Sequence, residues 1–402
     1  MPASAPQSES NPAKPLAKKD RYDVVTLPGD GIGPEVTTQA VGVLKVAAEK
    51  HGVSLSFEEI PGGGEYYLEH EREWPEGSEG RVDAADAILL GAVGAEDPTT
   101  GKTVFTKPGK PYPNAQLAGY AQVIGNRLRM QLFANVRPIK LYPGVPHKVS
   151  GRFMQVWNPE DVDYVVVREN TEEAYTGKTH DLTDDAGQVI GKTTPIEITQ
   201  AATERVVRYA FELARRRKAE GKPGKVTCVT KSNIIGAHKY FESIFQQVGE
   251  AEFADIEQDT AIFDAFCMWQ MRNPEWFDVI VAPNLVGDVI SDNGSTTQGG
   301  MGMAAGGNIG AEHGMFEPIH GSAPKHRGQD KVNPMAAILS AAMMCDWLGA
   351  RFSDERLLAM GQGIDQAVSE VLRAGKVLSY DLGGASKCSE VGEAIREAVA
   401  RG

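Results

Sequence analysis

The stretch RYDVVTLPGDGIGPEV, residues 21–36, decides the fold class of this 402-residue chain. Residues 22–27 have the apolar, β-rich pattern of a buried strand. The glycines of GDGIG then form a turn, and Pro34 suits the first turn of a helix. A strand, a glycine turn and a helix in this order are typical of an α/β fold. The turn is not GxGxxG, so a standard Rossmann domain is not favoured.

The rest of the chain continues the alternation of strands and helices. A helical pattern at 203–218 separates apolar runs, and the C-terminal third turns helical. Such alternation predicts a sheet covered by helices, and the length predicts two domains. The predicted interior strands are 87–93, 164–170, 225–230 and 278–284.

Three segments are expected to lie outside the regular elements. Residues 1–20 are rich in Pro, Ser, Ala and Lys, which predicts a disordered N-terminal tail. Residues 178–195 are polar with a DDAG turn, which predicts a hairpin arm that a partner subunit could pair with. A mobile surface loop is the alternative. Residues 299–310, GGMGMAAGGNIG, are too rich in glycine for stable regular structure, and we expect a close-packed connection between domains.

Charge and composition exclude several classes of function. The formal charge of −13 (41 basic against 54 acidic residues) argues against a nucleic-acid partner. No apolar run approaches the length of a membrane span. The four cysteines form no CxxC pair, so a reducing compartment is favoured, and we expect a cytoplasmic protein. A local basic pocket for a small anionic substrate remains compatible with this charge.

Two acids in NLVGDVISDNGS, residues 284–295, stand in apolar surroundings. Asp288 and Asp292 would lie on one helix face, where like charges cost a few tenths of a kcal/mol. Asp264 in AIFDAFCMWQM is a third candidate. Three converging carboxylates would need a hard divalent cation such as Mg²⁺ or Mn²⁺. Helix caps or salt-bridge partners are the structural alternative.

Five further residues are candidates for binding and proton transfer. Arg127, Arg137 and Arg168 would suit a substrate with several carboxylates, although each alone could be a surface ion-pair partner. Lys231 directly follows a buried strand, where desolvation and a nearby cation could lower its pKa. Tyr175 could donate a proton.

The order of six motifs resembles one enzyme family. The motifs are GDGIGPEV, LRMQLFANVRP, RENTEEAYTG, TKSN, NLVGDVISD and FEPIHGSAPKHRGQDKVNP. From about residue 22 to the C-terminus the chain resembles the metal-dependent β-decarboxylating dehydrogenases, which include isocitrate and 3-isopropylmalate dehydrogenases. The resemblance implies a non-Rossmann α/β fold with a central mixed sheet, two domains and an active-site cleft between them.

The resemblance also implies a domain division and a homodimer with shared active sites. A large, discontinuous cofactor-binding domain would comprise 21–132 and 299–402. A smaller domain for dimerisation, substrate and metal would comprise 133–298. The implied reaction oxidises the 2-hydroxyl of a 3-substituted malate by hydride transfer to NAD⁺ or NADP⁺ and then releases CO₂.

Roles for the candidate residues follow from the same resemblance. Arg127, Arg137 and Arg168 would clamp the malate carboxylates. Mg²⁺ or Mn²⁺ would be held by Asp288 and Asp292, with Asp264 reaching in from the other subunit. Lys231, also from the neighbouring subunit, would serve the first deprotonation, together with an aspartate such as Asp288. Tyr175 would protonate the enol carbon afterwards.

Cofactor preference is implied by the region around HGSAPKHRGQDKVNP. Lys325 and His326 stand where NADP-using isocitrate dehydrogenases carry Lys and Tyr, and NAD-using members typically have an acid at the Lys325 position. Gly384, however, stands where the NADP pattern has an arginine. We predict NADP⁺, with NAD⁺ as the alternative. The residues that match the cofactor-binding pattern are Glu317, His320, Gly321, Ala323, Lys325, His326, Asn333 and Tyr380.

The third arm of the substrate is the hardest part to predict. Isocitrate enzymes usually place Ser and Asn where this chain has Ala121 and Val123, so the apolar lining favours a non-polar or unusual substituent. Lys102, Lys107 and Lys110 could meet an anionic arm if they folded inward, or could be solvated.

Several substrates and two other classes of function stay open. Isocitrate is the first candidate, from RENTE, GQDKVNP and KCSE. Alternatives are 3-isopropylmalate, from LLGAVG and LFANVRPIKLYPGV, and homoisocitrate, tartrate-like, aryl- or phosphonate-bearing malates. A regulatory subunit is disfavoured by the intact set of candidate residues. The absence of GxxxxGK[ST] disfavours phosphoryl transfer.

Overall fold

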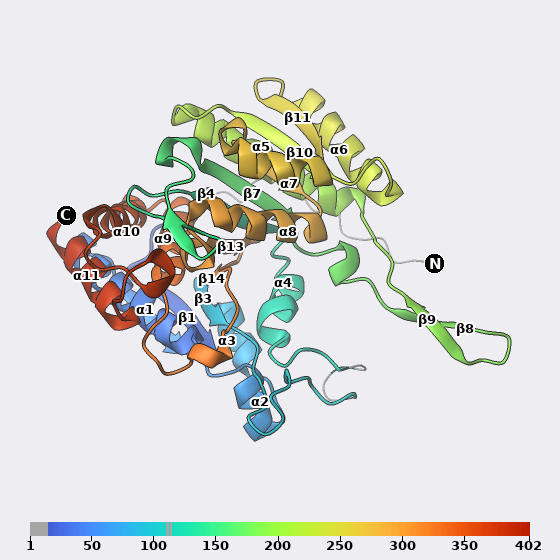
Figure 1. Cartoon of the computed structure of the whole chain (residues 1–402), viewed down its shortest axis with the longest axis horizontal. Helices are drawn as coiled ribbons and strands as arrows, with labels where there is room; N and C mark the ends of the chain where they lie inside the picture. Colours follow the sequence, from blue (N-terminus) through green and yellow to red (C-terminus); the bar gives the residue numbers. More distant parts are fainter. Residues whose placement is uncertain (1–14, 110–111, 113–114) are drawn as a thin grey trace.

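The computed structural model of the chain describes residues 15–109, 112 and 115–402. Most of the predicted tail (1–14) and Lys110 therefore lie outside the described residues. Residues 15–20 have no regular structure, and Lys19 Nζ lies 2.5 Å from the Asp86 carboxylate on the folded body. The described part is an α/β fold built on one large sheet (Figure 1).

Ten strands of the described chain form this sheet. Neighbouring strands run parallel, except at the centre, where β4 is antiparallel to β7 and β13, and β13 is antiparallel to β14. This mixed order confirms the non-Rossmann α/β fold that the resemblance implied. From one edge to the other the strands are β11 (Glu257–Ile262), β10 (Lys225–Thr230), β12 (Val279–Ala282), β7 (Asp163–Glu169), β4 (Ala134–Lys140), β13 (Ala305–Ile309), β14 (Gly314–Pro318), β3 (Ala87–Ala92), β1 (Tyr22–Gly29) and β2 (Leu55–Glu59).

The two halves of the sheet come from different parts of the chain. The strands from β11 to β4 belong to residues 134–282, whereas those from β13 to β2 belong to 22–92 and 305–318. Segments far apart in sequence therefore meet where β4 pairs with β13. This change of origin is compatible with the predicted domain division, which stays a prediction.

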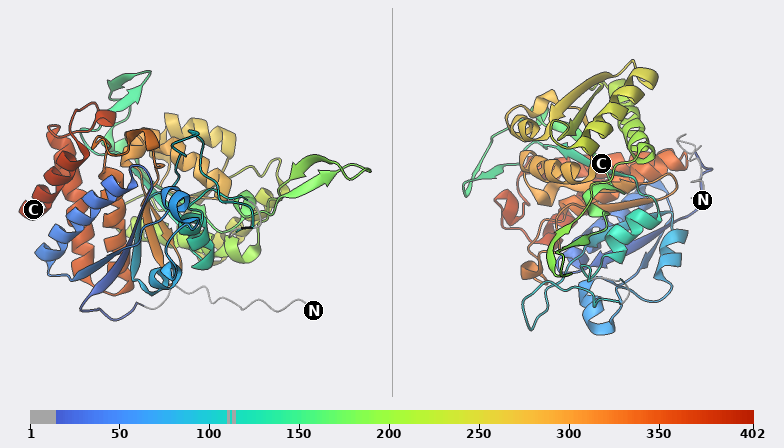
Figure 2. Two further views of the ribbon diagram at one scale, coloured as in Figure 1. Left: turned by 90° about the horizontal axis from the view of Figure 1, so that it is seen from below. Right: turned by 90° about the vertical axis from the view of Figure 1, so that its right-hand side faces the viewer.

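Helices cover the sheet in two groups (Figures 1 and 2). One group lies over the half that contains β1, β3 and β14. Its members α1 (Gly33–His51) and α9 (Met335–Arg351) pack on the strands, while α10 (Glu355–Ala374) packs on α9 and α1, and α11 (Cys388–Arg401) packs on α1 and α10. The other packs on β7, β10 and β12: α5 (Gln200–Ala219), α6 (Gly236–Glu252), α7 (Phe263–Arg272) and α8 (Asn284–Ser295). Among the described helices, none is both long and apolar enough to cross a bilayer.

Shorter elements complete the described chain. The short α-helices are α2 (Gly64–His70), α3 (Ser78–Ala84) and α4 (Asn126–Arg129). A π-helical turn, η1 (Ala121–Gly125), precedes α4. The 3₁₀ turns are η2 (Pro159–Asp161), η3 (Glu173–Tyr175), η4 (Pro274–Trp276), η5 (Thr296–Gln298), η6 (Met301–Met303), η7 (Pro324–His326) and η8 (Tyr380–Leu382).

Two small antiparallel hairpins lie apart from the main sheet. One consists of β5 (His147–Val149) and β6 (Arg152–Met154). The other, β8 (His180–Thr183) and β9 (Val189–Thr193), occupies the segment where a hairpin arm was predicted and projects far from the body (Figure 2). Its side chains at Leu182, Val189 and Ile190 are exposed. That a partner subunit covers this arm stays a prediction.

The prediction for residues 299–310 was wrong over its second half. Residues 305–309 form β13, a fully buried strand in the middle of the sheet. Glycine is tolerated there because the ring of Phe316 on β14 fills the missing side-chain space. A Cβ on Gly307 would lie 3.0 Å from that ring. The glycine content of the segment therefore could not show that its backbone would form hydrogen bonds with strands on both sides, β4 and β14.

Candidate active site

Two buried arginines from neighbouring strands face helix α8. Arg137 lies on β4 and Arg168 on β7, and both are less than a tenth exposed. Gly287 lets α8 lie directly against β7, because a Cβ at this position would be 2.6 Å from Arg168 Cβ. The glycine of GDVISD thus brings the acids of α8 to these arginines.

Arg168 is held by two partners. Its Nε and Nη2 donate to Asn284 Oδ1 at 2.9 and 2.6 Å, and its Nη1 donates to Asp288. Burial, together with the positive charge of Arg137, lowers the pKa of Arg168 to about 10. The guanidinium therefore stays charged at neutral pH. Asn284 was missed in the sequence, although its position after Pro283, at the end of the apolar run 278–284, was visible.

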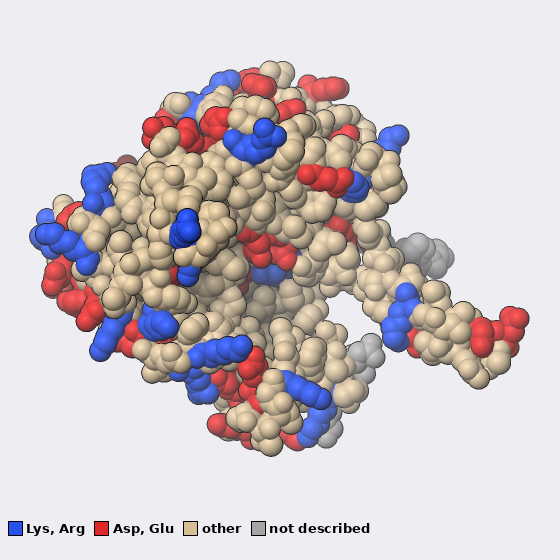
Figure 3. Space-filling view, in the orientation of Figure 1, with Lys and Arg blue, Asp and Glu red and all other residues tan. Residues whose placement is uncertain are grey.

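The pKa values of the paired acids of α8 are shifted in opposite directions by their environments. Arg137 Nη1 lies 3.2 Å from Asp288 Oδ1 and 3.1 Å from Asp292 Oδ1. Burial raises the pKa of Asp288, but the charges of Arg168 and Arg137 outweigh it and hold that pKa below its usual value. For Asp292 burial dominates, and the pKa is raised. The arginines thus relieve the repulsion that the sequence pattern implied. Figure 3 shows acidic and basic side chains meeting in a recess of this face.

The two acids of α8 fit a hard cation, but one chain does not assemble the predicted trio. Asp288 and Asp292 offer partly exposed carboxylate oxygens, the donors that Mg²⁺ and Mn²⁺ prefer. Asp264 at the start of α7 instead pairs with Lys231, which follows β10. Asp264 and Lys231 thus form a second cluster, separate from the arginines.

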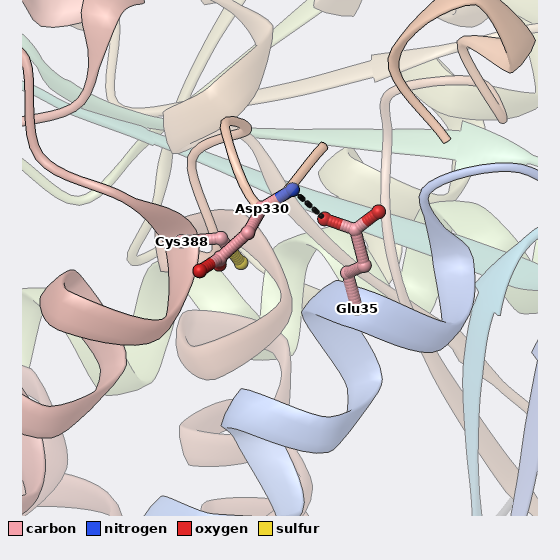
Figure 4. Close-up of side chains that lie close together, drawn as sticks. All are labelled: Glu35, Asp330 and Cys388. Carbon is pink, nitrogen blue, oxygen red and sulfur yellow. Dashed lines mark hydrogen bonds between the residues drawn. The ribbon is translucent and has the colours of Figure 1, made fainter. Parts of the chain in front are cut away.

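Among the described residues, a different trio meets the distance test for a metal site. Glu35, Asp330 and Cys388 have ligand atoms within 4.8 Å of one another (Figure 4). Their carboxylates already accept backbone and hydroxyl hydrogens: Glu35 from the N–H groups of Gly328 and Asp330, and Asp330 from Ser389. The cluster therefore anchors the segment around 328–330 to α1 and α11.

A cavity of about 180 Å³ opens beside the arginines. Arg127 on α4 and Glu317 on β14 form an ion pair at 2.8 Å on its wall, and Asn308 also donates to Glu317 at 2.8 Å. Nε of Arg127 is buried and has no hydrogen-bond partner among the residues that the structure describes. The lining residues include Val93, Val123, Arg127, Arg137, Glu317, His320 and Gly321. Tyr175 is near as well: its hydroxyl donates to Asp288, and its ring lies 4.9 Å from the Arg168 guanidinium.

The π-helical turn η1 contributes one side chain, that of Val123, to the lining of this cavity. Gly125 N–H donates to Tyr120 O at 2.9 Å, and the buried Glu73 accepts the Gly119 N–H at 2.6 Å. Val123 lines the cavity, whereas Ala121 is not among its lining residues. Val93 supplies a second apolar wall that sequence reasoning missed. Its position at the end of the AILLGAV strand was the available signal, since sites in α/β folds form there.

The two described loop lysines, Lys102 and Lys107, are not brought to the cavity. Lys107 pairs with Glu71 on the outside, Lys102 is exposed, and Lys110 lies outside the described residues. Within the described part, the cations that line the cavity are thus Arg127 and Arg137.

The predicted cofactor residues gather at the edge of the same region. His320 Nε2 and His326 Nδ1 are buried and lack partners among the described residues. Burial lowers the pKa of His320. The His326 ring lies 5.8 Å from that of Tyr380, and Lys325 is exposed beside them. Asn333 is already bonded to Asp381 at 3.1 Å. The unpartnered nitrogens of His320 and His326 and the rings of His326 and Tyr380 fit a dinucleotide. Gly321 and Ala323 lie in the chain segment between the two histidines.

Comparison with known proteins places these features in context. Residues 23–395 match the family described as isocitrate/isopropylmalate dehydrogenase. The 3-isopropylmalate dehydrogenase of Thermobifida fusca is 37% identical, over 94% of this chain and 97% of that protein. The decarboxylating D-malate dehydrogenase of Escherichia coli is 34% identical, over 94% and 98%. The solved isocitrate dehydrogenase from Methylococcus capsulatus has a TM-score of 0.78 at 31% identity, over 94% and 99%.

Proposed function

Because the chain belongs to the isocitrate/isopropylmalate dehydrogenase family of decarboxylating dehydrogenases, we propose that it is an NADP⁺-dependent oxidative decarboxylase of a 3-substituted malate whose third substituent is apolar. The observation that carries this proposal is the convergence of Arg137, Arg168 and Asp288 beside a cavity with two valine walls.

The arginines act as the carboxylate clamp. Arg127 and Arg137 line the cavity from two sides, and Arg168 is fixed by Asn284 behind them. Guanidinium groups bind carboxylates through two parallel hydrogen bonds, which orients the malate as well as attracting it. Glu317, held by Arg127 and Asn308, forms the wall toward the cofactor side.

Asp288 and Asp292 would hold Mg²⁺ or Mn²⁺, with Asp264 from the partner subunit. A divalent cation there would polarise the 2-hydroxyl and stabilise negative charge on that oxygen. The Tyr175 hydroxyl, held at Asp288, is placed to deliver a proton to the enol carbon. Lys231, held by Asp264, serves the first deprotonation in the neighbouring site of a homodimer.

NADP⁺ is favoured over NAD⁺ by the groups beside the adenosine loop. Lys325 and the unpartnered His326 Nδ1 suit a 2′-phosphate, whereas a carboxylate at Lys325 would repel it. The Tyr380 ring lies 5.8 Å from the ring of His326 and so borders the same group of residues. The catalytic form we propose is a homodimer, and its cytoplasmic location stays a prediction.

The third arm is proposed to be apolar because Val93 and Val123 line the cavity, whereas Lys107 pairs with Glu71 on the outside and Lys102 is exposed. Relatives that act on 3-isopropylmalate and D-malate are consistent with a cavity whose lysine and arginine lining, within the described chain, consists of Arg127 and Arg137. Isocitrate is the second candidate, since RENTE, GQDKVNP and KCSE are typical of isocitrate dehydrogenases.

A substrate panel tests the proposal. The purified enzyme is assayed at 340 nm with Mn²⁺, NADP⁺ or NAD⁺, and D-malate, 3-methylmalate, 3-isopropylmalate, isocitrate and homoisocitrate. The expected result is the highest kcat/KM for an apolar substituent with NADP⁺. A higher kcat/KM with isocitrate would overturn the apolar arm, and a higher value with NAD⁺ would overturn the cofactor assignment. Flat traces throughout would overturn the enzyme assignment.

A further inference from the structure

Glu173 occupies a conformation that its side chain does not favour. It has φ of 72°, in the left-handed region, and its side chain is 1% exposed. A non-glycine residue in this region is destabilising because its Cβ crowds the backbone, and burying a carboxylate adds a further cost. Such costs persist only where the surroundings hold the residue in place, and they cluster at functional sites. The positive φ and the burial of Glu173 in the motif RENTEEAYTG therefore call for a functional explanation.

The Glu173 carboxylate is bonded on both oxygens. Oε1 lies 2.9 Å from Nε2 of His238, which is also buried, and Oε2 accepts the N–H of Leu285. Nδ1 of His238 accepts the N–H of Lys231 at 3.1 Å. One buried pair thus joins three segments that are distant in sequence: the η3 turn with Tyr175, the turn with Lys231, and the first turn of α8.

These bonds specify one tautomer of His238. Because Nδ1 accepts the Lys231 N–H, its proton lies on Nε2, which donates to Glu173. No other standard side chain reproduces both bonds: an asparagine amide reaches about as far as Nδ1, and a glutamine amide about as far as Nε2.

We propose that the Glu173–His238 pair is a positioning clasp that holds Tyr175 and Lys231 in register with helix α8. Neither member touches the cavity, so both act through the residues they hold. The clasp rests on the roles proposed above for Tyr175 and Lys231. In a dimer with shared sites, these two residues serve different active sites, so the clasp would join the proton-transfer groups of both sites through a single chain.

Two matched substitutions separate the arms of the clasp. His238→Asn keeps an acceptor for the Lys231 N–H but loses the hydrogen bond to Glu173. His238→Gln keeps a donor to Glu173 but loses the hydrogen bond from Lys231. Each is expected to lower kcat by roughly 10–100-fold, since small misplacements of catalytic groups have effects of this size. KM and the Kd for NADPH, measured by fluorescence, should stay within about twofold because the arginine clamp and cofactor loop are untouched.

The solvent deuterium isotope effect on kcat provides a readout that a merely structural role would not move. It should rise in both variants, because proton transfer becomes slower relative to the other steps. His147→Asn is the matched control: His147 is equally buried and bonds Thr297 O at 3.0 Å, away from Tyr175 and Lys231. It should lower the melting temperature without raising the isotope effect.

The double variant Glu173→Gly/His238→Leu guards against loss of folding. Glycine adopts positive φ freely, and replacing both partners of a buried pair costs less than removing one. If this variant and the two His238 variants fold and keep wild-type kcat and isotope effect, the clasp is refuted while the proposed function stands. Tyr175→Phe distinguishes failure of the clasp from failure of the proposed function, because full activity in that variant would refute the role proposed for Tyr175 itself.

Discussion

The Tyr175 hydroxyl bonds one oxygen of Asp288, and Arg168 and Arg137 contact the other. Both oxygens of the carboxylate proposed as a metal ligand are therefore contacted by groups proposed to bind substrate and to donate a proton. Metal, substrate and proton donor thus share one residue, and changing it should affect all three.

Asp288→Asn is expected to abolish Mn²⁺-dependent turnover while the fold persists. The amide removes the negative charge that a divalent cation needs, so the loss should exceed the roughly 10–100-fold typical of an outer-sphere partner. Mn²⁺ titration by electron paramagnetic resonance and steady-state rates measure the effect. Asp255→Asn, an exposed acid paired with Arg215, is the control. Undiminished activity of Asp288→Asn would refute the metal assignment.

Lys325→Asp should shift cofactor preference from NADPH toward NADH. A carboxylate beside the 2′-phosphate adds repulsion, and we expect NADPH binding to weaken about 10-fold or more, while NADH changes little. Kd values for both nucleotides at low and high salt measure this shift. Lys376→Asp makes the same change of charge at an exposed position on another segment. An equal effect of both substitutions would contradict a specific role for Lys325.

Val123→Asn should improve isocitrate relative to 3-isopropylmalate. The amide offers hydrogen bonds to a third carboxylate and places a polar group against an isopropyl arm, so the ratio of kcat/KM values should move by about 10-fold or more. Ile124→Asn, beside it but not among the cavity-lining residues, is the control. A ratio that moves equally in both variants would show that Val123 does not contact the third arm.

Mixed dimers test the sharing of active sites. Tyr175→Phe and Lys231→Ala should each be inactive as homodimers. Co-expression should restore about a quarter of the wild-type activity, because half of the dimers are hybrids with one intact site of two. Tyr175→Phe combined with Asp288→Asn should restore none, since the two residues meet within one chain. Restoration in the second pair only would reverse the proposed arrangement.

Asp354 should make stability depend on acid. It caps α10 through the Arg356 N–H, accepts the Tyr22 hydroxyl at 2.9 Å, and its pKa is held well below the usual value, first by the hydrogen bond from Arg356 and then by that from Tyr22. Asp354→Ala should cost about 1–2 kcal/mol at pH 7. Because the pKa of Asp354 is lower in the folded chain than in the unfolded chain, its carboxylate stabilises the fold at pH values above the unfolded pKa of about 4. This contribution is lost as the pH falls through the folded pKa.

Urea unfolding at pH 7 and pH 3 measures this dependence. Asp354→Asn keeps the capping oxygen without the charge, so the free energy of unfolding of the wild type should approach that of this variant at pH 3. An identical difference between wild type and Asp354→Asn at both pH values would contradict the predicted linkage.

The local signals in the sequence predicted much of the fold. Apolar runs marked β1, β3, β7, β10 and β12, and the spacing of Asp288 and Asp292 placed both acids on one face of α8. The strand β13 was missed because its stability comes from β4 and β14 and from the Phe316 ring, not from its own residues.

The contacts that define the site could not be read from local pattern. Asn284 holds Arg168 across 116 positions, and His238 holds Glu173 across 65. Neither pair has a fixed spacing or a composition that marks it, and Val93 meets Val123 only because the strand and the π-turn face the same cavity.

By itself, the sequence indicated the class of chemistry through the order of motifs that resemble one enzyme family, while charge and periodicity supplied the candidate residues and the shared helix face of Asp288 and Asp292. Only the tertiary structure decided which of those groups meet. It gave Asp288 two guanidinium partners and the η3 turn a buried clasp, and it directed Val123 but not Ala121 into the cavity. Those outcomes depend on burial and on distances between segments that chain connectivity alone does not set.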